Sequence, residues 1–271
     1  MTPSQSYAER HEIAAETFRR FNPGSDTERT ATGFAARLGA LGSMAFDVVG
    51  AMWSRPQLSR RDRSLMVISV LAAQARQDEL EAHTRFGIGH GLTRSEVEEI
   101  LLHVAAYAGF PAAMAASRRI DAALRTVEGV ERLSDRKAAA RKSDAERDRD
   151  AAALFKTVSG GRGGDDPAKD VALMESMLGE VGVIAYRWAF GEIWCRPELS
   201  RRDRSLAVIA ILVSLGATPE LAVHVPTGLA HGLSRTEIEE IINHMALYCG
   251  IPRAVEAMRT AREAFAKSDG T

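Results

Sequence analysis

Cysteine and aromatic residues are scarce in this sequence of 271 residues, which has two cysteines and aromatic side chains at 6% of its positions. Cys195 and Cys249 lie far apart and form no CxxC pair, which argues against a cysteine zinc site and a thiol redox pair. We therefore expect both to be small buried apolar residues. The net charge of −1 gives no electrostatic reason to expect nucleic acid or an anionic membrane as a partner.

Long apolar runs are missing as well. No stretch approaches the roughly 18 apolar residues of a membrane-spanning helix, and the first residues, MTPSQSYAERHEI, are polar, unlike a signal peptide. With 45% apolar and 26% charged residues, the chain has the composition of an ordinary globular protein. The sequence therefore predicts a cytoplasmic protein without a membrane segment.

What the sequence does contain is one unit written twice. The stretch WSRPQLSRRDRSLMVI begins at Trp53 and returns as WCRPELSRRDRSLAVI at Trp194, an offset of 141 residues. Further upstream an offset of 137 aligns Phe18 with Phe155, which places about four extra residues of the second copy in the loop SGGRGGDD. At the offset of 141, four further pairs match: His83 with His224, His90 with His231, His103 with His244, and Tyr107 with Tyr248.

The repeat predicts the domain organisation. A unit of this length is too long for a solenoid period, and a fused pair of domains derived from a homodimer explains it better. We predict a first domain over residues 1–130, a charged linker over 131–143, and a second domain over 144–271.

Local signals are helical in both copies. Ser59, three residues before an aspartate, predicts the start of a helix that extends to about Gln74, with an apolar stripe that includes Leu65. Thr93 with a glutamate three residues later predicts the next helix, which Gly109 ends. The same signals recur in the second copy, and we find no convincing alternation of period two. The predicted class is all-α.

The paired histidines are candidates for acid–base chemistry, because histidine titrates near neutral pH. His83 follows Glu79 by four residues, so a surface ion pair on one helix is the alternative. His103 and Tyr107 have the same spacing, and a hydrogen-bonded interface pair explains them as well as catalysis does. No HExxH motif or carboxylate cluster accompanies these histidines, so we expect no metal site.

His90 and His231 stand directly before a glycine at the end of a helix. A cation at that end complements the helix dipole, which favours a capping role for both side chains.

Arginine is the natural ligand for a carboxylate, because its guanidinium group can bind both oxygens. Arg63 lies one turn before an apolar position of its helix, and Arg55 precedes a proline outside the helix. Each is a candidate anion ligand. An intramolecular pair with Asp62 or Glu79 is the alternative for Arg63.

Together these residues resemble the carboxymuconolactone decarboxylase family, within the AhpD-like all-α superfamily. The resemblance is carried by the paired tryptophan-arginine stretches, by ELEAHTRFGIGHGLTRSEVEEILLHVAAYAGFPAA, and by HGLSRTEIEEIINHMALYCGIPRA. It covers nearly the whole of both copies. It implies two tandem AhpD-like helical domains related by a pseudo-twofold axis.

The peroxidase branch of that superfamily uses a glutamate, a CxxC motif and a histidine. At the cysteine positions this sequence has Arg76 and Glu79 in the first copy and Ala217 and Glu220 in the second, with Ser64 and Ser205 at the glutamate position. Without a thiol at these positions there is no nucleophile to attack a peroxide. The resemblance therefore points to the decarboxylase branch and not to a thiol peroxidase.

The resemblance implies a cofactor-independent decarboxylase that acts on a carboxylated butenolide such as 4-carboxymuconolactone in aromatic catabolism. It implies Arg63 and Arg204 as anion ligands and His83 and His224 as acids. The remaining residues expected to contact the substrate are Arg55, Arg196, Glu79, Glu220, Trp53, Trp194, Tyr107 and Tyr248.

Other functions and assemblies remain as alternatives. A lactone hydrolase or isomerase acting on a related cyclic acid fits the same residues, and so does a non-catalytic binding module. His90 and His231 replace an asparagine usual in the decarboxylase branch, and Arg85 is matched by Pro226, so the two sites differ or one is inactive. Relatives with one unit per chain form rings, which implies a trimer of two-unit chains here, with a monomer as the alternative.

Overall fold

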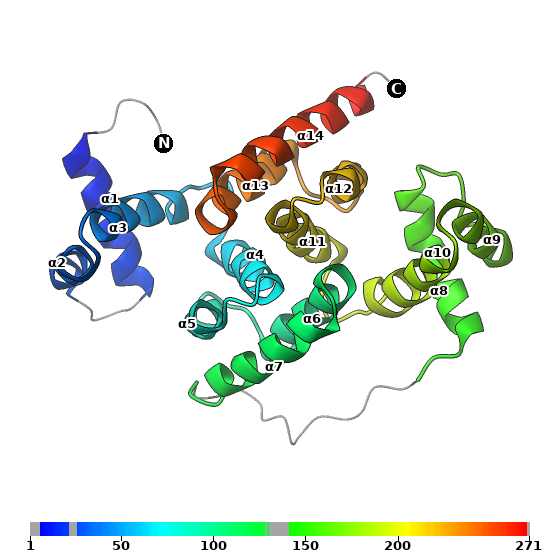
Figure 1. The fold of residues 1–271 in the computed structure, drawn as a ribbon, viewed down its shortest axis with the longest axis horizontal. Helices are drawn as coiled ribbons and strands as arrows, with labels where there is room; N and C mark the ends of the chain where they lie inside the picture. The colour runs from blue at the N-terminus through cyan, green and yellow to red at the C-terminus, as the bar shows by residue number, and fades with distance from the viewer. Residues whose placement is uncertain (1–5, 22–25, 128, 130–140, 270–271) are drawn as a thin grey trace. The chain divides into compact units, whose positions relative to one another are not determined.

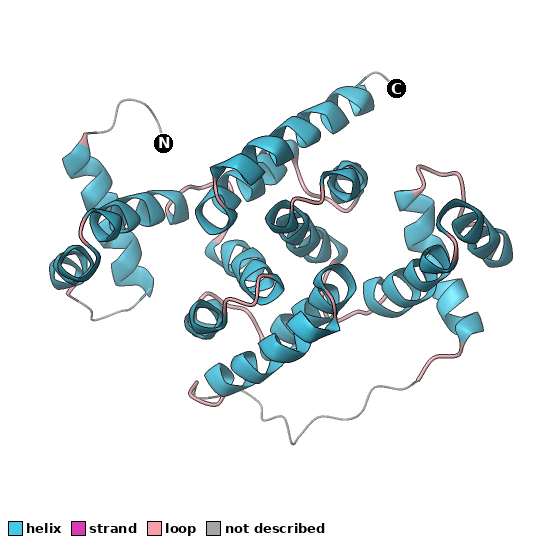
Figure 2. Cartoon of the chain, in the orientation of Figure 1, coloured by secondary structure: helices cyan, strands magenta, loops and turns pink. Residues whose placement is uncertain are grey.

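The computed structural model describes residues 6–21, 26–127, 129 and 141–269, and every regular element in these ranges is a helix (Figure 2). The all-α class predicted from the capping signals is confirmed. Residues 131–140, most of the predicted linker, lie outside the described ranges. Within these ranges no helix combines the length and the apolar character needed to cross a bilayer.

The two copies of the repeat contribute helices in the same order (Figure 1). The first copy forms α1 (Tyr7–Phe21), α2 (Thr27–Leu38), α3 (Ala40–Trp53), α4 (Arg60–Ala73), α5 (Gln77–Gly89), α6 (Arg94–Ala108) and α7 (Phe110–Leu124). The second forms α8 (Asp144–Val158), α9 (Pro167–Leu178), α10 (Glu180–Ile184), the π-helix η2 (Ala185–Trp194), α11 (Arg201–Leu215), α12 (Thr218–Ala230), α13 (Arg235–Cys249) and α14 (Ile251–Asp269).

The second copy carries one of its extra residues inside a helix. Asp26 and Asp166, the N-cap residues of α2 and α9, align at an offset of 140, whereas Gly50 and Gly191 align at 141. The residue added between them falls where α10 continues as η2, because a π-helix absorbs one more residue without breaking the helix. The prediction that all four extra residues lie in the SGGRGGDD loop is therefore wrong for one of them.

The chain divides into two compact units, residues 1–63 and 64–271, with the boundary in the first turn of α4. In the first unit α1 and α3 pack around a small core that includes Phe46 and Ala14. Gly50 permits this packing, because a Cβ at that position would overlap Ala14.

The second unit is built around α11, which contacts α6, α12, α13 and α14. Every residue of α11 from 203 to 214 is buried, as is every residue of α4 from 64 to 72. The apolar stripe predicted for α4 is therefore too narrow, because a helix in the centre of a core is covered on all sides. Polar groups at the start of α11 share this burial and need partners inside the protein.

The predicted helix starts are confirmed at α6 and α13. Thr93 with Glu96 and Ser234 with Glu237 each form a complete capping box. Gly109 follows the end of α6 with φ of 95°, a conformation that favours glycine. These local signals set where α6 begins and ends, and they thereby decide which of its residues face α11.

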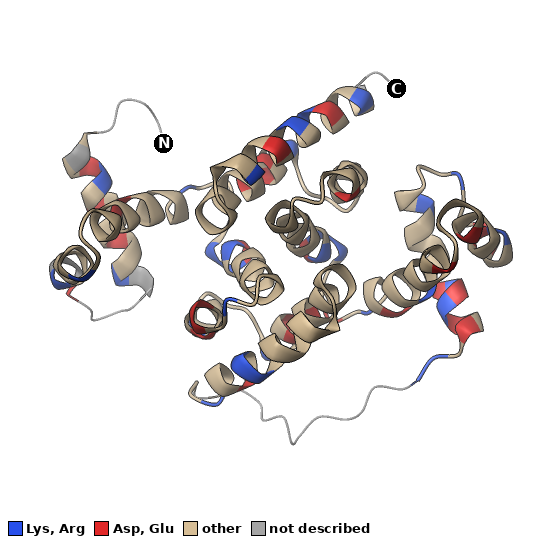
Figure 3. Ribbon diagram, viewed as in Figure 1, with Lys and Arg blue, Asp and Glu red and all other residues tan. Residues whose placement is uncertain are grey.

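Charged residues of both signs are mixed along α14 (Figure 3). Arg253, Glu256 and Arg259, for example, occur at intervals of three residues. The charge of α11 is confined to its first turn, residues 201–204. The buried charged residues of α11, Asp203 and Arg204, therefore lie at this end of the helix.

Candidate active site

Arg204 is the centre of the site in the second unit. Its side chain is fully buried, and its Nε donates to the carbonyl of Leu199 at 2.9 Å. One Nη2 proton goes to the carbonyl of Arg196 at 2.9 Å and another to the Glu99 carboxylate at 2.9 Å. An Nη1 proton is donated to His103 at 3.0 Å. Four of the five guanidinium protons are thus used inside the protein.

Glu99 joins the two arginines of the second copy across the repeat. Its other carboxylate oxygen accepts from Nε of Arg196 at 2.7 Å. Glu99 is buried, whereas a quarter of the Arg196 side chain is exposed and also lies near Glu198 at 3.4 Å. Burial lowers the pKa of Arg204, and Glu99 partly offsets this effect. Two guanidinium groups therefore share one buried carboxylate, and the partly exposed one of Arg196 also has Glu198 as a second partner.

His103 is neutral, and its tautomer is decided by Arg204. Since a guanidinium group only donates, Nε2 of His103 must be the unprotonated acceptor and Nδ1 carries the proton. Burial and then the charge of Arg204 hold the pKa of His103 well below its usual value. His103 and Tyr107 do not bond each other, since their rings stack at 6.3 Å, but each bonds a residue of the second copy, so both belong to the interface between the copies.

An aromatic cluster continues from His103 to the second histidine. The Trp194 ring meets His103 edge-on at 5.1 Å and stacks on His224 at 5.9 Å. Trp194 Nε1 donates to the Tyr107 hydroxyl at 3.1 Å, and this hydroxyl lies 3.2 Å from Nε2 of His224. Burial, followed by the nearby His231, lowers the pKa of His224 to about 4. His224 is therefore a neutral imidazole near pH 7.

His231 is the third histidine whose ring contacts that of Trp194, after His103 and His224. Its Nδ1 lies 2.8 Å from the Ser205 hydroxyl, and its ring is 5.7 Å from that of Trp194. It is the C-cap residue of α12, as predicted. However, burial and then Arg201 lower its pKa to about 4, so the predicted cationic interaction with the helix dipole is wrong.

The second unit also contains residues of the first copy that correspond to these, with contacts of their own. His83 meets Tyr248 edge-on at 5.8 Å, and Tyr248 stacks on His244 at 5.5 Å. The hydroxyl of Ser64 lies 2.8 Å from Nδ1 of His90, which matches the contact of Ser205 with His231. Burial and then His90 lower the pKa of His83 to about 4.

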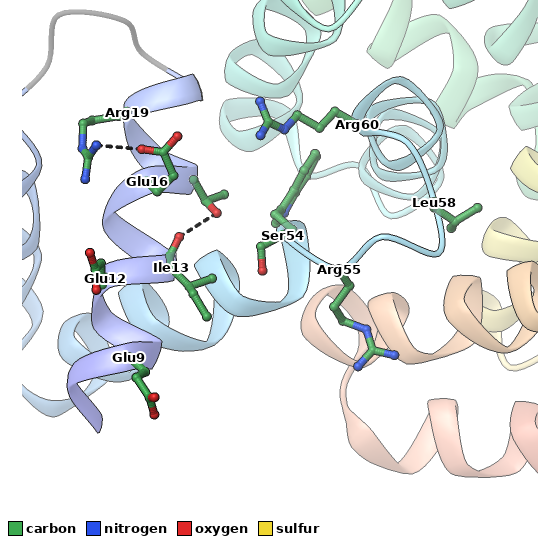
Figure 4. Close-up of a pocket in the computed structure, with 11 residues that line it drawn as sticks. Glu9, Glu12, Ile13, Glu16, Arg19, Ser54, Arg55, Leu58 and Arg60 are labelled. Atoms are coloured by element: carbon green, nitrogen blue, oxygen red, sulfur yellow. Dashed lines mark hydrogen bonds and ion pairs between the residues drawn. The ribbon is translucent and has the colours of Figure 1, made fainter. Parts of the chain in front are cut away.

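Three predicted site residues, Trp53, Arg55 and Arg63, belong to the first unit. Arg63 is fully buried and donates from Nη2 to the carbonyl of Arg55 at 2.8 Å, as Arg204 does to that of Arg196. Trp53 and Arg55 line a cavity of about 730 Å³ between α1 and the end of α3 (Figure 4). The opposite wall carries Glu9, Glu12 and Glu16 of α1.

The structure does not bring the predicted residues Glu79 and Glu220 to the histidines. Both are exposed in the first turns of α5 and α12. No ion pair or hydrogen bond joins Glu220 to His224 or Glu79 to His83 among the described residues, so the i,i+4 surface pair considered for this spacing does not form. Across the described ranges no group of three or more His, Cys, Asp or Glu residues is placed to hold a metal ion.

The cysteines differ from the buried apolar residues expected. Both are free thiols of intermediate exposure. Cys195 lies 3.0 Å from the Lys142 ammonium group, and burial raises the pKa of Cys249.

Sequence reasoning missed Glu99, which bridges the two arginines. The signal was present, because Glu99 is matched by Glu240 at the offset of 141 and lies four residues before His103. An acidic residue on the apolar face of a helix requires a partner, but its partners, Arg196 and Arg204, lie about 100 residues away. Ser205 was noted only as the replacement for a glutamate, although it bonds His231.

Comparison with known proteins places the chain in a family. Residues 41–122 and 184–263 each match the sequence model of the carboxymuconolactone decarboxylase family. The chain belongs to this family and carries two copies of its domain in tandem, so the resemblance seen in the sequence is confirmed.

Three relatives show how far this similarity extends. A 4-carboxymuconolactone decarboxylase of Acinetobacter baylyi is 43% identical over 79 residues, 29% of this chain and 59% of the relative. A nitrosuccinic acid decarboxylase of Metarhizium robertsii is 39% identical over 71 residues, 26% of this chain and 50% of the relative. An uncharacterized 15.0 kDa protein of Paracoccus denitrificans is 28% identical over 102 residues, 37% of this chain and 76% of the relative. The chain thus spans only between half and three fifths of the two decarboxylases.

Proposed function

We propose that this chain is a cofactor-independent decarboxylase of a small organic acid, with a carboxylated butenolide such as 4-carboxymuconolactone as the substrate. The observation that carries the proposal is the buried cluster in which Arg196, Arg204 and Glu99 adjoin the neutral pair of Tyr107 and His224. Two relatives with decarboxylase names support the reaction type.

Decarboxylation of such a substrate requires only a few contributions from the protein. When CO₂ leaves a γ-carboxy butenolide, the electrons of the broken C–C bond move through the ring alkene into the lactone carbonyl, and a dienolate forms. The protein must bind the carboxylates, supply hydrogen bonds where negative charge develops on the carbonyl oxygen, and allow one proton to reach the ring. Arginine suits the first task, and an imidazole suits the others.

Arg196 is the better candidate for binding a substrate carboxylate. The sequence favoured Arg204, but that side chain is fully buried and four of its five protons are engaged. Arg196 is partly exposed, and no described residue accepts a hydrogen bond from its Nη1. In this proposal Arg204 holds Glu99 and His103 in place, while Arg55 takes the place of Arg196 in the first copy.

The relatives agree on the type of reaction but differ in the substrate that their names give. The two named relatives carry the names of decarboxylases of a lactone acid and of a nitro acid. In both acids the carbanion left by CO₂ can delocalise onto an oxygen, so the shared requirement is an anion-binding group beside a hydrogen-bond donor. A lactone hydrolase or isomerase uses the same groups without release of CO₂.

A panel of acids tests this proposal. We expect the purified chain to release CO₂ from 4-carboxymuconolactone or from nitrosuccinic acid, and to give no thiol-dependent turnover of peroxides, because Cys195 and Cys249 stand outside the positions that the peroxidase branch uses. Lactone opening or isomerisation without CO₂ would favour the alternative. Binding without turnover of any acid would favour a non-catalytic module.

We also propose that three chains assemble into a ring, in which each fused pair takes the place of a dimer. Large apolar side chains are exposed at equivalent places of both copies, such as Phe110 at 73% and Ile251 at 70%. Met114 and Val255 follow one turn later and are exposed too. Exposed apolar residues that recur in both copies favour burial against other chains.

Light scattering of the purified protein is the measurement for this assembly. We expect a mass near three chains, and we expect Phe110→Asp with Ile251→Asp to lower it, since a buried carboxylate disfavours an apolar interface. A mass of one chain at all concentrations would exclude the ring and leave the monomer.

A further inference from the structure

The hydrogen-bond chain from Trp194 through Tyr107 to His224 runs in one direction only. The indole nitrogen is a donor without an acceptor function, so the Tyr107 oxygen must accept from it at 3.1 Å. The hydroxyl proton then needs an acceptor, and among the described residues this acceptor is Nε2 of His224 at 3.2 Å. A neutral imidazole that accepts at Nε2 carries its proton on Nδ1.

The Nδ1–H group of His224 has no hydrogen-bond acceptor among the described residues. The Nδ1 atom of His224 is buried, and no described residue forms a hydrogen bond with it. A buried donor without a partner costs free energy, and such groups in a site are available to a ligand. Trp194 stacked on one face of the ring and Tyr107 against its edge hold the imidazole in this orientation.

We infer that Tyr107 is a positioning residue that holds His224 as the neutral Nδ1–H tautomer, so that His224 donates a hydrogen bond to negative charge on the substrate and does not act as an imidazolium acid. This inference rests on the proposed function for its use in the reaction. The bond to CO₂ breaks, its electron pair reaches the lactone oxygen, and the Nδ1–H group stabilises that oxygen. Water then supplies the proton that the ring carbon takes up.

The surroundings of His224 favour the neutral form. The titratable groups that face it are Tyr107 and His103 from α6 and His231 at the end of its own helix. Burial raises the pKa of the Tyr107 hydroxyl and lowers those of both histidines, so all three are neutral near pH 7 and none is an anion. A proton on both ring nitrogens would therefore meet no compensating charge.

In each copy the histidine is contacted by a tyrosine of the other copy. Tyr107 belongs to the first copy and serves the histidine of the second, while Tyr248 of the second copy contacts His83 of the first. The matched histidine of each copy therefore depends on a tyrosine of the other copy for its contacts. This dependence gives the fusion a function beyond a larger buried surface.

Nitrogen-15 NMR of the full chain without substrate tests the tautomer directly. We expect Nδ1 of His224, assigned with the His224→Gln variant, to be protonated in the unmodified chain. In Tyr107→Phe, which keeps the ring and removes the hydroxyl, we expect the Nε2–H form to increase. Tyr248→Phe is the matched control and should leave the His224 signals unchanged. An Nε2–H form in the unmodified chain, or no change in Tyr107→Phe, would overturn the inference.

The pH profile separates the two roles when a substrate of the panel is turned over. A neutral donor predicts a rate that is flat between about pH 5 and pH 8, because a group with a pKa of about 4 stays neutral there. An imidazolium acid with that pKa predicts a tenfold rise for each unit that the pH falls, which would contradict the inference. Tyr107→Phe should lower kcat about tenfold, the effect of losing one hydrogen bond, with KM little changed. If the tautomer is found but no acid is turned over, the proposed function fails and the positioning role stands.

Discussion

Replacing His224 with alanine is expected to lower kcat for CO₂ release at the second site by about 10²–10⁴-fold, the range for removal of a group that handles a proton or stabilises an oxyanion. Among the described residues, Nδ1 of His224 is buried without a hydrogen-bond partner, as are Nδ1 of His103 and Nε2 of His231, and the hydroxyl of Tyr107 holds the ring of His224 from its other nitrogen. The measurement is kcat per folded molecule with the best acid of the panel. Because the first copy has an equivalent histidine, the His83→Ala, His224→Ala double variant removes both contributions.

Controls decide whether such a loss is chemical. His11→Ala removes the histidine that has no counterpart in the second copy and that bonds Asp47 at 3.2 Å in the first unit, and it should leave kcat unchanged. Each variant needs a thermal unfolding curve. A lower melting temperature of His224→Ala with unchanged kcat per folded molecule would assign this residue a structural role only. Unequal effects of His83→Ala and His224→Ala would show which copy is active.

Removing Glu99 is expected to destabilise the unit formed by residues 64–271 by about 3–5 kcal/mol, the usual effect of breaking a buried ion pair from one side. Arg204 would remain fully buried with its charge, and Arg196 would lose its shortest contact. The measurement is urea unfolding of Glu99→Ala and Glu99→Gln. The glutamine variant should lose less, because its amide oxygen still accepts from one guanidinium group.

Glu198→Ala provides the matched control for this prediction. Glu198 lies 3.4 Å from the same Arg196 but more than a third of its side chain is exposed, and exposed ion pairs contribute no more than about 1 kcal/mol. Equal stabilities of Glu99→Ala and Glu198→Ala would contradict the assignment of Glu99 as the centre of the buried charge cluster.

The sequence alone determined the helical class, the duplication and the starts of α4, α6, α11 and α13. These properties depend on neighbours in the chain, such as Thr93 with Glu96 at the start of α6. The repeat also marked the tryptophans, arginines and histidines of the site, because both copies retain them at one offset. The inserted residue that produces η2 was misplaced, since an alignment without structure assigns length differences to loops.

The tertiary structure alone decided which residues meet. Glu99 with Arg204 and Tyr107 with His224 are separated by 105 and 117 residues, and spacing along a helix carries no information about such contacts. Glu79 has the ideal spacing to His83 but stays on the surface, because the buried face of α5 is formed by Leu80, Thr84 and Gly87. The protonation states of His103 and His224 also depend on burial and on a partner from another helix. Chemistry at this site thus depends on packing between the two copies, which brings together donors and acceptors that each copy alone leaves without a partner.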